Sequence, residues 1–161
     1  MRLTTAQIGR CGELLVQYAL LSRGIESAPM STDTGIDLVA YSPASKLPST
    51  IQVKTNLTAK PGGGRGAPVL DWWVRANSPA QIVALVDMTE TRIWLFTHEE
   101  LVDLAQQKPS SGKLRFFMKV TPARRPRKDG KAQDLEHFHP FRLENRIAEL
   151  FKLPKGEALG Q

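Results

Sequence analysis

The sequence contains a single cysteine, no long apolar run and no secretory signal pattern. One thiol, Cys11, can form neither an internal disulfide nor a cysteine metal cluster, so both are excluded. No apolar run approaches the roughly 18 residues that a membrane-spanning helix requires. The N-terminus also lacks the basic-then-apolar pattern of a signal peptide. We therefore expect a protein of the reducing cytoplasm with no membrane partner.

Acidic residues are too few to balance the basic ones. The 161 residues include 22 Lys and Arg but only 16 Asp and Glu, which gives a net charge of +6 and an isoelectric point near 9.7. An excess of cations favours a polyanionic partner such as DNA, because binding releases counterions from the phosphate backbone. A basic protein without such a partner is the alternative. The length and the hydrophobic content of 41% predict one globular domain over residues 1–161.

Two short apolar stretches rich in β-branched residues, at 35–41 and 51–55, have the length and composition of strands. The Ser- and Pro-rich residues 42–50 lie between them and predict a surface loop. The pattern therefore predicts two antiparallel strands. Asp37 begins the first strand just after Gly35, where a side chain can stand clear of the sheet.

The second of these strands carries two polar side chains on one face. Gln52 and Lys54 are two residues apart, so they share a face. The alternate residues Ile51 and Val53 then point into the core. With Asp37, an acid, an amide and a lysine converge at one end of the sheet. A hard cation such as Mg²⁺ binds carboxylate and carbonyl oxygens, and a lysine could orient or deprotonate the attacking water or offset charge on a phosphate. These residues therefore predict metal-assisted cleavage of a phosphodiester.

The sequence resembles the PD-(D/E)XK nuclease superfamily in Asp37, in the tripeptide Gln52–Lys54 and in the upstream Glu13. It is most similar to the Holliday-junction-resolvase-like and Mrr-like branches, some of which carry QxK in place of ExK. The resemblance covers residues 5–56. It implies an α/β fold with a restriction-endonuclease-like core, in which helices flank a central mixed β-sheet. It also implies a DNA endonuclease that hydrolyses phosphodiester bonds with Mg²⁺ or Mn²⁺ and works as a homodimer or higher homo-oligomer.

The resemblance also implies a role for each of four residues. Asp37 would be the main metal ligand and Gln52 a second one. Lys54 would be the catalytic lysine, and Glu13 would assist in positioning the metal or the water. Most members have a carboxylate where this sequence has Gln52, which leaves a second hypothesis, a nucleic-acid-binding protein that keeps the fold without cleavage. Under a third, Asp37 and Lys54 form the ion pair of an ordinary structural domain.

Residues 4–23 have the pattern of an amphipathic helix with a capping box at its start. From periodicity alone, Glu13 is a solvated residue of this helix. Gly9 and Gly12 lower the helix propensity. Their small size would let another backbone or a phosphate approach the helix beside Glu13.

The rest of the chain alternates strand and helix signals. Adjacent Trp72 and Trp73 must face opposite sides of their strand, so one belongs to the core and the other is partly exposed. Thr97 is a good N-cap for the helix that follows it. We expect strands at 25–30, 69–74, 82–88, 92–96 and 114–120, of which the third and fourth form a hairpin, and helices at 98–107 and 144–153.

Two polar segments could contact DNA. Residues 56–68 form a glycine-rich loop, either a mobile flap over DNA or a plain connector, and it lacks the Gly-Lys-Ser/Thr of a phosphate-binding loop. Residues 122–131 are rich in Arg, Lys and Pro, which predicts an extended, exposed segment that is either a solvated loop or a phosphate-contacting arm. The candidate nucleic-acid-binding residues are Lys60, Arg65, Arg124, Arg125, Arg127 and Lys128.

Overall fold

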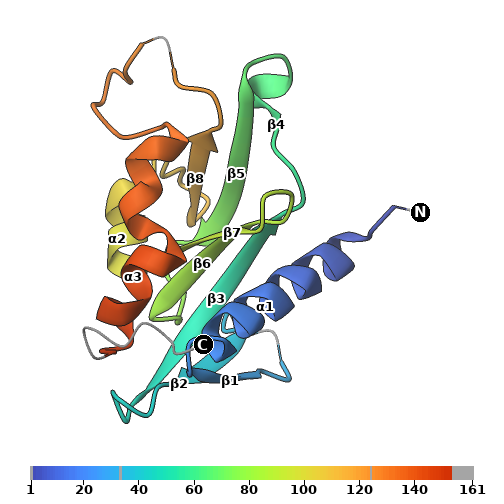
Figure 1. Cartoon of the computed structure of the whole chain (residues 1–161). Helices are drawn as coiled ribbons and strands as arrows, with labels where there is room; N and C mark the ends of the chain where they lie inside the picture. Colours follow the sequence, from blue (N-terminus) through green and yellow to red (C-terminus); the bar gives the residue numbers. More distant parts are fainter. Residues whose placement is uncertain (1, 33, 124, 154–161) are drawn as a thin grey trace.

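The computed structural model describes residues 2–32, 34–123 and 125–153 (Figure 1). Over these ranges, no helix has the length and apolar character needed to cross a bilayer. In chain order the elements are α1 (Thr5–Leu21), β1 (Glu26–Pro29), β2 (Leu38–Tyr41), β3 (Pro48–Asn56), β4 (Lys60–Pro61), the 3₁₀ helix η1 (Gly62–Gly64), β5 (Pro68–Arg75), β6 (Ile82–Asp87), β7 (Arg92–Thr97), α2 (His98–Leu104), β8 (Lys113–Lys119), the 3₁₀ helix η2 (Leu135–Phe141) and α3 (Leu143–Leu150).

The central sheet has five strands in the order β1-β2-β3-β6-β7. The β2–β3 pair is antiparallel, with Leu38 opposite Ile51, as the two apolar stretches predicted. The β6–β7 pair is the predicted hairpin, whereas β3 and β6 run parallel. The sheet is therefore mixed and the fold is α/β, which confirms the expected class.

A second sheet of three antiparallel strands, in the order β4-β5-β8, was not foreseen. Strands were expected at β5 and β8, whereas β4 lies in residues 56–68, which were expected to form a loop, and nothing local in the sequence joins β5 to β8. Two of its strands, β4 and β5, lie within the connection between the parallel strands β3 and β6, where such crossovers usually place a helix, and β8 comes after α2. Along β5, Trp72 is buried and Trp73 is 47% exposed, as the alternation predicted.

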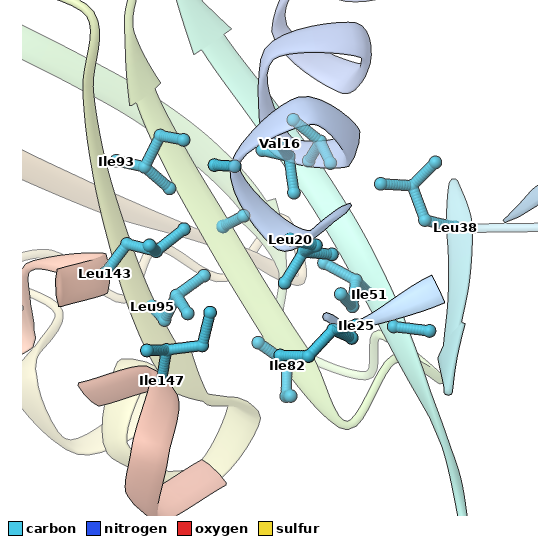
Figure 2. Packing of buried hydrophobic residues seen from close by; sticks show 14 of the residues in the cluster. Val16, Leu20, Ile25, Leu38, Ile51, Ile82, Ile93, Leu95, Leu143 and Ile147 are labelled. Carbon is cyan, nitrogen blue, oxygen red and sulfur yellow. The ribbon is translucent and has the colours of Figure 1, made fainter. Parts of the chain in front are cut away.

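Apolar residues form one core on each face of the central sheet. On one face, α1 and α3 cover the sheet, so that Val16 and Leu20 of α1 and Ile147 of α3 pack on its strands (Figure 2). On the other face, the three-stranded sheet, α2 and η2 enclose a core rich in aromatic rings. Its largest side chains are Trp72, Trp94, Phe96, Phe116 and Phe138.

The capping box at the start of α1 is confirmed. The Thr4 hydroxyl accepts a hydrogen bond from the Gln7 N–H, and the Gln7 side chain accepts one from the Thr4 N–H. These bonds satisfy amide groups that have no partner inside the helix. After the helix ends, Gly24 adopts a φ of 73°, which turns the chain toward β1.

The helix predicted over 98–107 ends earlier, at Leu104. The reason is a contact with a distant strand. The side chain of Gln106 accepts a hydrogen bond from the Phe117 N–H at 2.9 Å and donates one to the Phe117 carbonyl at 2.8 Å. Gln106 therefore serves as an edge partner of β8 rather than as a helix residue. The predicted N-cap, Thr97, is confirmed, since its hydroxyl accepts from the Glu100 N–H.

The two glycines of α1 have different surroundings. A Cβ at Gly12 would lie 1.9 Å from Oγ1 of Thr55 and 2.9 Å from its Cβ. A Cβ at Gly9 would meet no described atom within 4 Å. The close approach expected beside Glu13 is therefore real at Gly12, and the group that approaches is the side chain of a β3 residue.

Gly12→Ala should lower the free energy of unfolding by about 1–3 kcal/mol, because the stiff Thr55 side chain must move away from the added methyl group. Gly9→Ala should instead raise it by about 0.5–1 kcal/mol, because alanine favours the helix and the site is open. Urea denaturation followed by circular dichroism measures both values. Equal changes in the two variants would show that α1 does not rest on Thr55.

Candidate active site

Asp37 binds the backbone of β3 on both sides of Gln52. Its N–H donates to the Ile51 carbonyl at 2.9 Å, and its carboxylate Oδ2 accepts from the Val53 N–H at 2.6 Å. The register of β2 with β3 ends at the Leu38–Ile51 pair, so Asp37 stands where the two strands part. The predicted proximity of Asp37 and Gln52 thus has a structural basis in the backbone.

Gln52 is held in a tight polar site. Its side chain is only 3% exposed, and its Oε1 accepts a hydrogen bond from the Ser78 hydroxyl at 3.2 Å. A Cβ at Gly35 would lie 3.7 Å from its Nε2, and Gly35 has a φ of 85°, which favours glycine. The loops before β2 and β6 therefore pack against the Gln52 amide and hold it in place. Sequence reasoning missed Ser78, because it lies 26 residues away in a turn with no distinctive pattern.

Lys54 is half-buried and opens onto a groove of about 770 Å³. The groove follows β3 beyond its pairing with β2, between the start of α1 and residues 56–60. Three cations line it, Arg2, Lys54 and Lys60, and its described lining contains no acidic residue. A hollow lined by one sign of charge attracts the opposite sign, so this groove favours a phosphate chain.

Glu13 lies on α1, which covers the opposite face of the sheet. The residues of β3 that pack under α1 are Ile51 and Val53, so Gln52 and Lys54 lie on the other face. Glu13 shares a side of α1 with Gln17, four residues on, and Gln17 donates to the Ser27 carbonyl of β1 at 3.4 Å. Glu13 thus faces the β1 side and forms an ion pair with Arg10 at 2.7 Å. The structure therefore places Asp37, Gln52 and Lys54 along β3 and leaves Glu13 on the helix that covers the other face of the sheet.

The donor atoms at this edge fit a hard divalent cation. Within the described ranges, no three His, Cys, Asp or Glu side chains are grouped as a metal cage. Mg²⁺ does not need such a cage, because it commonly takes one or two carboxylates together with water and phosphate oxygens. The Asp37 carboxylate is of the preferred type. The Gln52 amide oxygen has two lone pairs, and Ser78 occupies one of them.

The glycine-rich segment is a small hairpin rather than an open loop. Lys60 and Pro61 pair with Val69 and Pro68, and Gly66 donates its N–H to the Gly62 carbonyl at 2.7 Å. Lys60 lines the same groove as Lys54, so the hairpin flanks the candidate site. Arg65 is exposed in the turn of the hairpin.

Most described residues of the basic segment 122–131 are exposed, as its composition predicted, but Arg127 is partly buried. Arg124 lies outside the described residues, and Arg125 and Lys128 are exposed. Arg127 departs from the prediction, because it forms an ion pair with Asp129 at 2.5 Å and also donates to the Gln106 carbonyl at 3.3 Å. The hydrogen bond from Arg127 lowers the pKa of Asp129 to about 2. The charge of Arg127 is therefore already compensated at neutral pH.

Comparison with known proteins identifies the architecture but no close relative. No protein-family model matches the sequence, and no curated protein sequence matches it. A bacterial homing endonuclease, I-Ssp6803I, has a similar structure, with a TM-score of 0.62 and 12% identity over 94% of this chain and 94% of that chain. The Holliday junction resolvase Hjc from the archaeon Archaeoglobus fulgidus gives a TM-score of 0.53 and 16% identity, over 92% of this chain and 98% of that one. Both have the PD-(D/E)XK fold.

This chain has the restriction-endonuclease-like fold. The similarity extends over nearly the whole chain, whereas the motif resemblance covered only residues 5–56. In this restriction-endonuclease-like fold, β2 parts from β3 at the predicted motif: Gln52 lies in β3, and Asp37 directly precedes β2, which begins at Leu38 and not at residue 35 as predicted.

Substitutions at Asp37 should separate its structural role from any chemical one. Asp37→Asn keeps an oxygen that can accept from the Val53 N–H, so the free energy of unfolding should change by less than about 1 kcal/mol. Asp37→Ala leaves that amide without the carboxylate and should cost about 1–3 kcal/mol. Urea denaturation measures both. If the two variants are equally unstable, the bond to Val53 is not what Asp37 contributes to the fold.

Proposed function

We propose that this protein is a divalent-metal-dependent DNA endonuclease that hydrolyses phosphodiester bonds. The observation that carries the proposal is the position of Asp37. It binds the backbone of β3 on both sides of Gln52, at the point where β2 parts from β3. The basic groove of Lys54 lies beside this point. Two solved nucleases with the same fold support the assignment to nuclease chemistry.

Asp37 and Gln52 would hold the cation, Mg²⁺ or Mn²⁺. When bound, such an ion supplies Lewis-acid polarisation of the phosphate and lowers the pKa of water. The Lys54 ammonium can donate hydrogen bonds to a phosphate oxygen as negative charge develops there. Glu13, on the helix side of β3, is proposed as an assisting carboxylate that orients water. Its ion pair with Arg10 must open or shift for that role.

The DNA backbone would follow the groove and the exposed cations around it. Arg2 and Lys60 line the groove, and Arg65, Arg125 and Lys128 are exposed. Arg124 and Arg127 were predicted in the same role, but the ion pair of Arg127 with Asp129 makes it the weaker candidate. Two active sites in one assembly would allow both strands of a duplex to be cleaved together, so we also propose a homodimer or higher homo-oligomer.

A nucleic-acid-binding protein without cleavage is the second candidate function. One observation favours it: Gln52 is a neutral, buried amide that already accepts a hydrogen bond from Ser78. A neutral oxygen attracts a dication less than a carboxylate does. Under this function the groove would bind phosphates and Lys54 would have only a binding role.

Lys54→Ala should lower the rate of plasmid nicking with Mg²⁺ by about 100-fold or more, because an ammonium that acts on the transition state is lost. DNA affinity, measured with Ca²⁺ in place of Mg²⁺, should stay within a few-fold of the parent. Lys46→Ala, in the turn before β3 at the opposite end of that strand from Lys60, is the control and should nick at the parent rate. Equal rates for Lys54→Ala and the parent would remove Lys54 from the mechanism.

Gln52→Glu should lower the Mg²⁺ concentration for half-maximal nicking on the order of tenfold, because a second carboxylate binds the cation more strongly. The new carboxylate can still accept from the Ser78 hydroxyl. Gln52→Leu should raise the metal requirement or end the activity. Nicking is measured against Mg²⁺ concentration for the three proteins. Three superimposed curves would show that position 52 is not a ligand. DNA binding without cleavage by all three would favour the second candidate function.

A further inference from the structure

The outer face of the three-stranded sheet carries an exposed tryptophan in an unusual setting. Strand alternation points Trp72 into the aromatic core and Trp73 outward, where its side chain is 47% exposed. A single exposed aromatic residue needs no explanation by itself. The groups packed around Trp73 are what distinguish it.

Arginine side chains and aromatic rings alternate across this face. The guanidinium of Arg115 lies 5.8 Å from the ring centre of Trp73 and 5.6 Å from that of Phe117. Arg127 lies over the Phe117 ring as well, at 5.6 Å. Asp71 fixes Arg115 with hydrogen bonds of 2.7 and 3.0 Å. A rigid cation thus supports one side of Trp73, so the ring is held in place before any ligand arrives.

A hollow of about 300 Å³ lies beside the Trp73 ring. Its opposite wall is the glycine hairpin, with Lys60, Gly62 and Gly63. Asn56 and Lys60 line both this hollow and the groove that contains Lys54. The Asn56 side chain donates to the Asp71 carbonyl at 2.9 Å, which ties the end of β3 to β5. The hollow at Trp73 is therefore a continuation of the groove of the candidate active site.

The charge around the hollow suits a nucleic acid. Among the described outward positions of β5 and β8, Asp71 is the one acidic residue, and its ion pair with Arg115 neutralises its negative charge. The other charged positions are cationic. They are Arg75, Lys113 and Lys119 on the two strands, with Lys60 on the hairpin. A flat ring beside ammonium groups is the arrangement that binds unpaired bases, since the ring stacks on the base and the cations contact phosphates.

We propose that an unpaired nucleotide of the DNA binds in this hollow, with its base stacked on Trp73 and its phosphate beside Lys60. A base within a duplex is already stacked on its neighbours, so it cannot offer its face to the ring without unstacking. The substrate class is therefore DNA with a single-stranded segment next to the scissile phosphate. This assignment of substrate rests on the proposed endonuclease function, whereas the stacking itself does not.

The test measures DNA binding by proteins that all carry Lys54→Ala, with Ca²⁺ as the metal, so that no cleavage intervenes. The probes are a blunt duplex and the same duplex with a single-stranded extension, both fluorescently labelled. The protein should bind the extended duplex at least about tenfold more tightly. Adding Trp73→Ala should weaken binding of the extended duplex by roughly 5- to 100-fold and leave the blunt duplex within twofold. Adding Trp73→Phe, which keeps a ring, should retain most of the preference.

Tyr18→Ala is the matched control, because Tyr18 is a more exposed aromatic residue, 71% exposed, on α1 and away from the hollow. It should leave both affinities unchanged. Thermal unfolding confirms that each variant is folded. Trp73 fluorescence should also be quenched by the extended duplex, whereas Trp72 and Trp94 are buried.

The outcomes separate this inference from the proposed function. Equal affinity for the two probes, or equal weakening of both by Trp73→Ala, overturns the stacking site. If the parent nicks plasmid with Mg²⁺ while Trp73→Ala changes no affinity, the endonuclease stands and the stacking site falls. If the parent never cleaves yet Trp73→Ala weakens only the extended duplex, the stacking site stands and the endonuclease falls.

Discussion

The hydrogen bond from the Val53 N–H to the Asp37 carboxylate is the constraint on which the candidate site depends. In a longer β2, a backbone carbonyl would have accepted the hydrogen bond from the Val53 N–H, and β2 would have covered this edge of β3. Because a side chain takes it instead, β2 can leave the sheet at Leu38 without a buried amide being left unpaired. Because the β2–β3 pairing ends early, the edge of β3 stays open. The groove between β3 and the start of α1 and the exposure of Lys54 follow from this open edge.

The two cores place the polar residues at the margin between two packed layers. Gln52 and Lys54 lie on the face of the central sheet that the second sheet covers, beside Val83 and Leu85 of that core. Gln52 is enclosed there with one hydroxyl partner, and Lys54 reaches the open groove. Burial thus fixes the amide while the lysine keeps contact with solvent. A fixed amide beside a more accessible ammonium is an arrangement that would suit the roles proposed for Gln52 and Lys54.

Sequence patterns predicted those features that depend on neighbouring residues. The capping box of α1, the β6–β7 hairpin and the opposite orientations of Trp72 and Trp73 each come from a rule of local geometry. The β2–β3 pair was also predictable, because a short loop joins the two strands. The family motif then indicated the fold, although the second sheet stayed hidden.

Most of the missed features rest on contacts between distant parts of the chain. Ser78 reaches Gln52 across 26 residues, and Arg115 reaches Asp71 across 44. No periodicity encodes either pair. At Arg127, composition counted a positive charge but could not show that Asp129 compensates it. Long-range pairing therefore decides the second sheet and the partner of Gln52, whereas the Arg127–Asp129 ion pair is a local contact that depends on the conformation of the segment.

The order in which the strands appear along the chain has a consequence for how the molecule folds. β5 is synthesised between β3 and β6 of the first sheet, but its partner β8 comes only after β6, β7 and α2. The first sheet has all its strands once residue 97 is available, whereas the second sheet, begun earlier with β4 and β5, must wait until residue 119. Contacts of such long sequence separation slow folding, because the loop must close before the pairing is gained. The segment that carries Asp37, Gln52 and Lys54 is thus no independent module: Gln52 gains its partner Ser78, and β3 its parallel neighbour β6, only after the chain has passed through β5 of the second sheet.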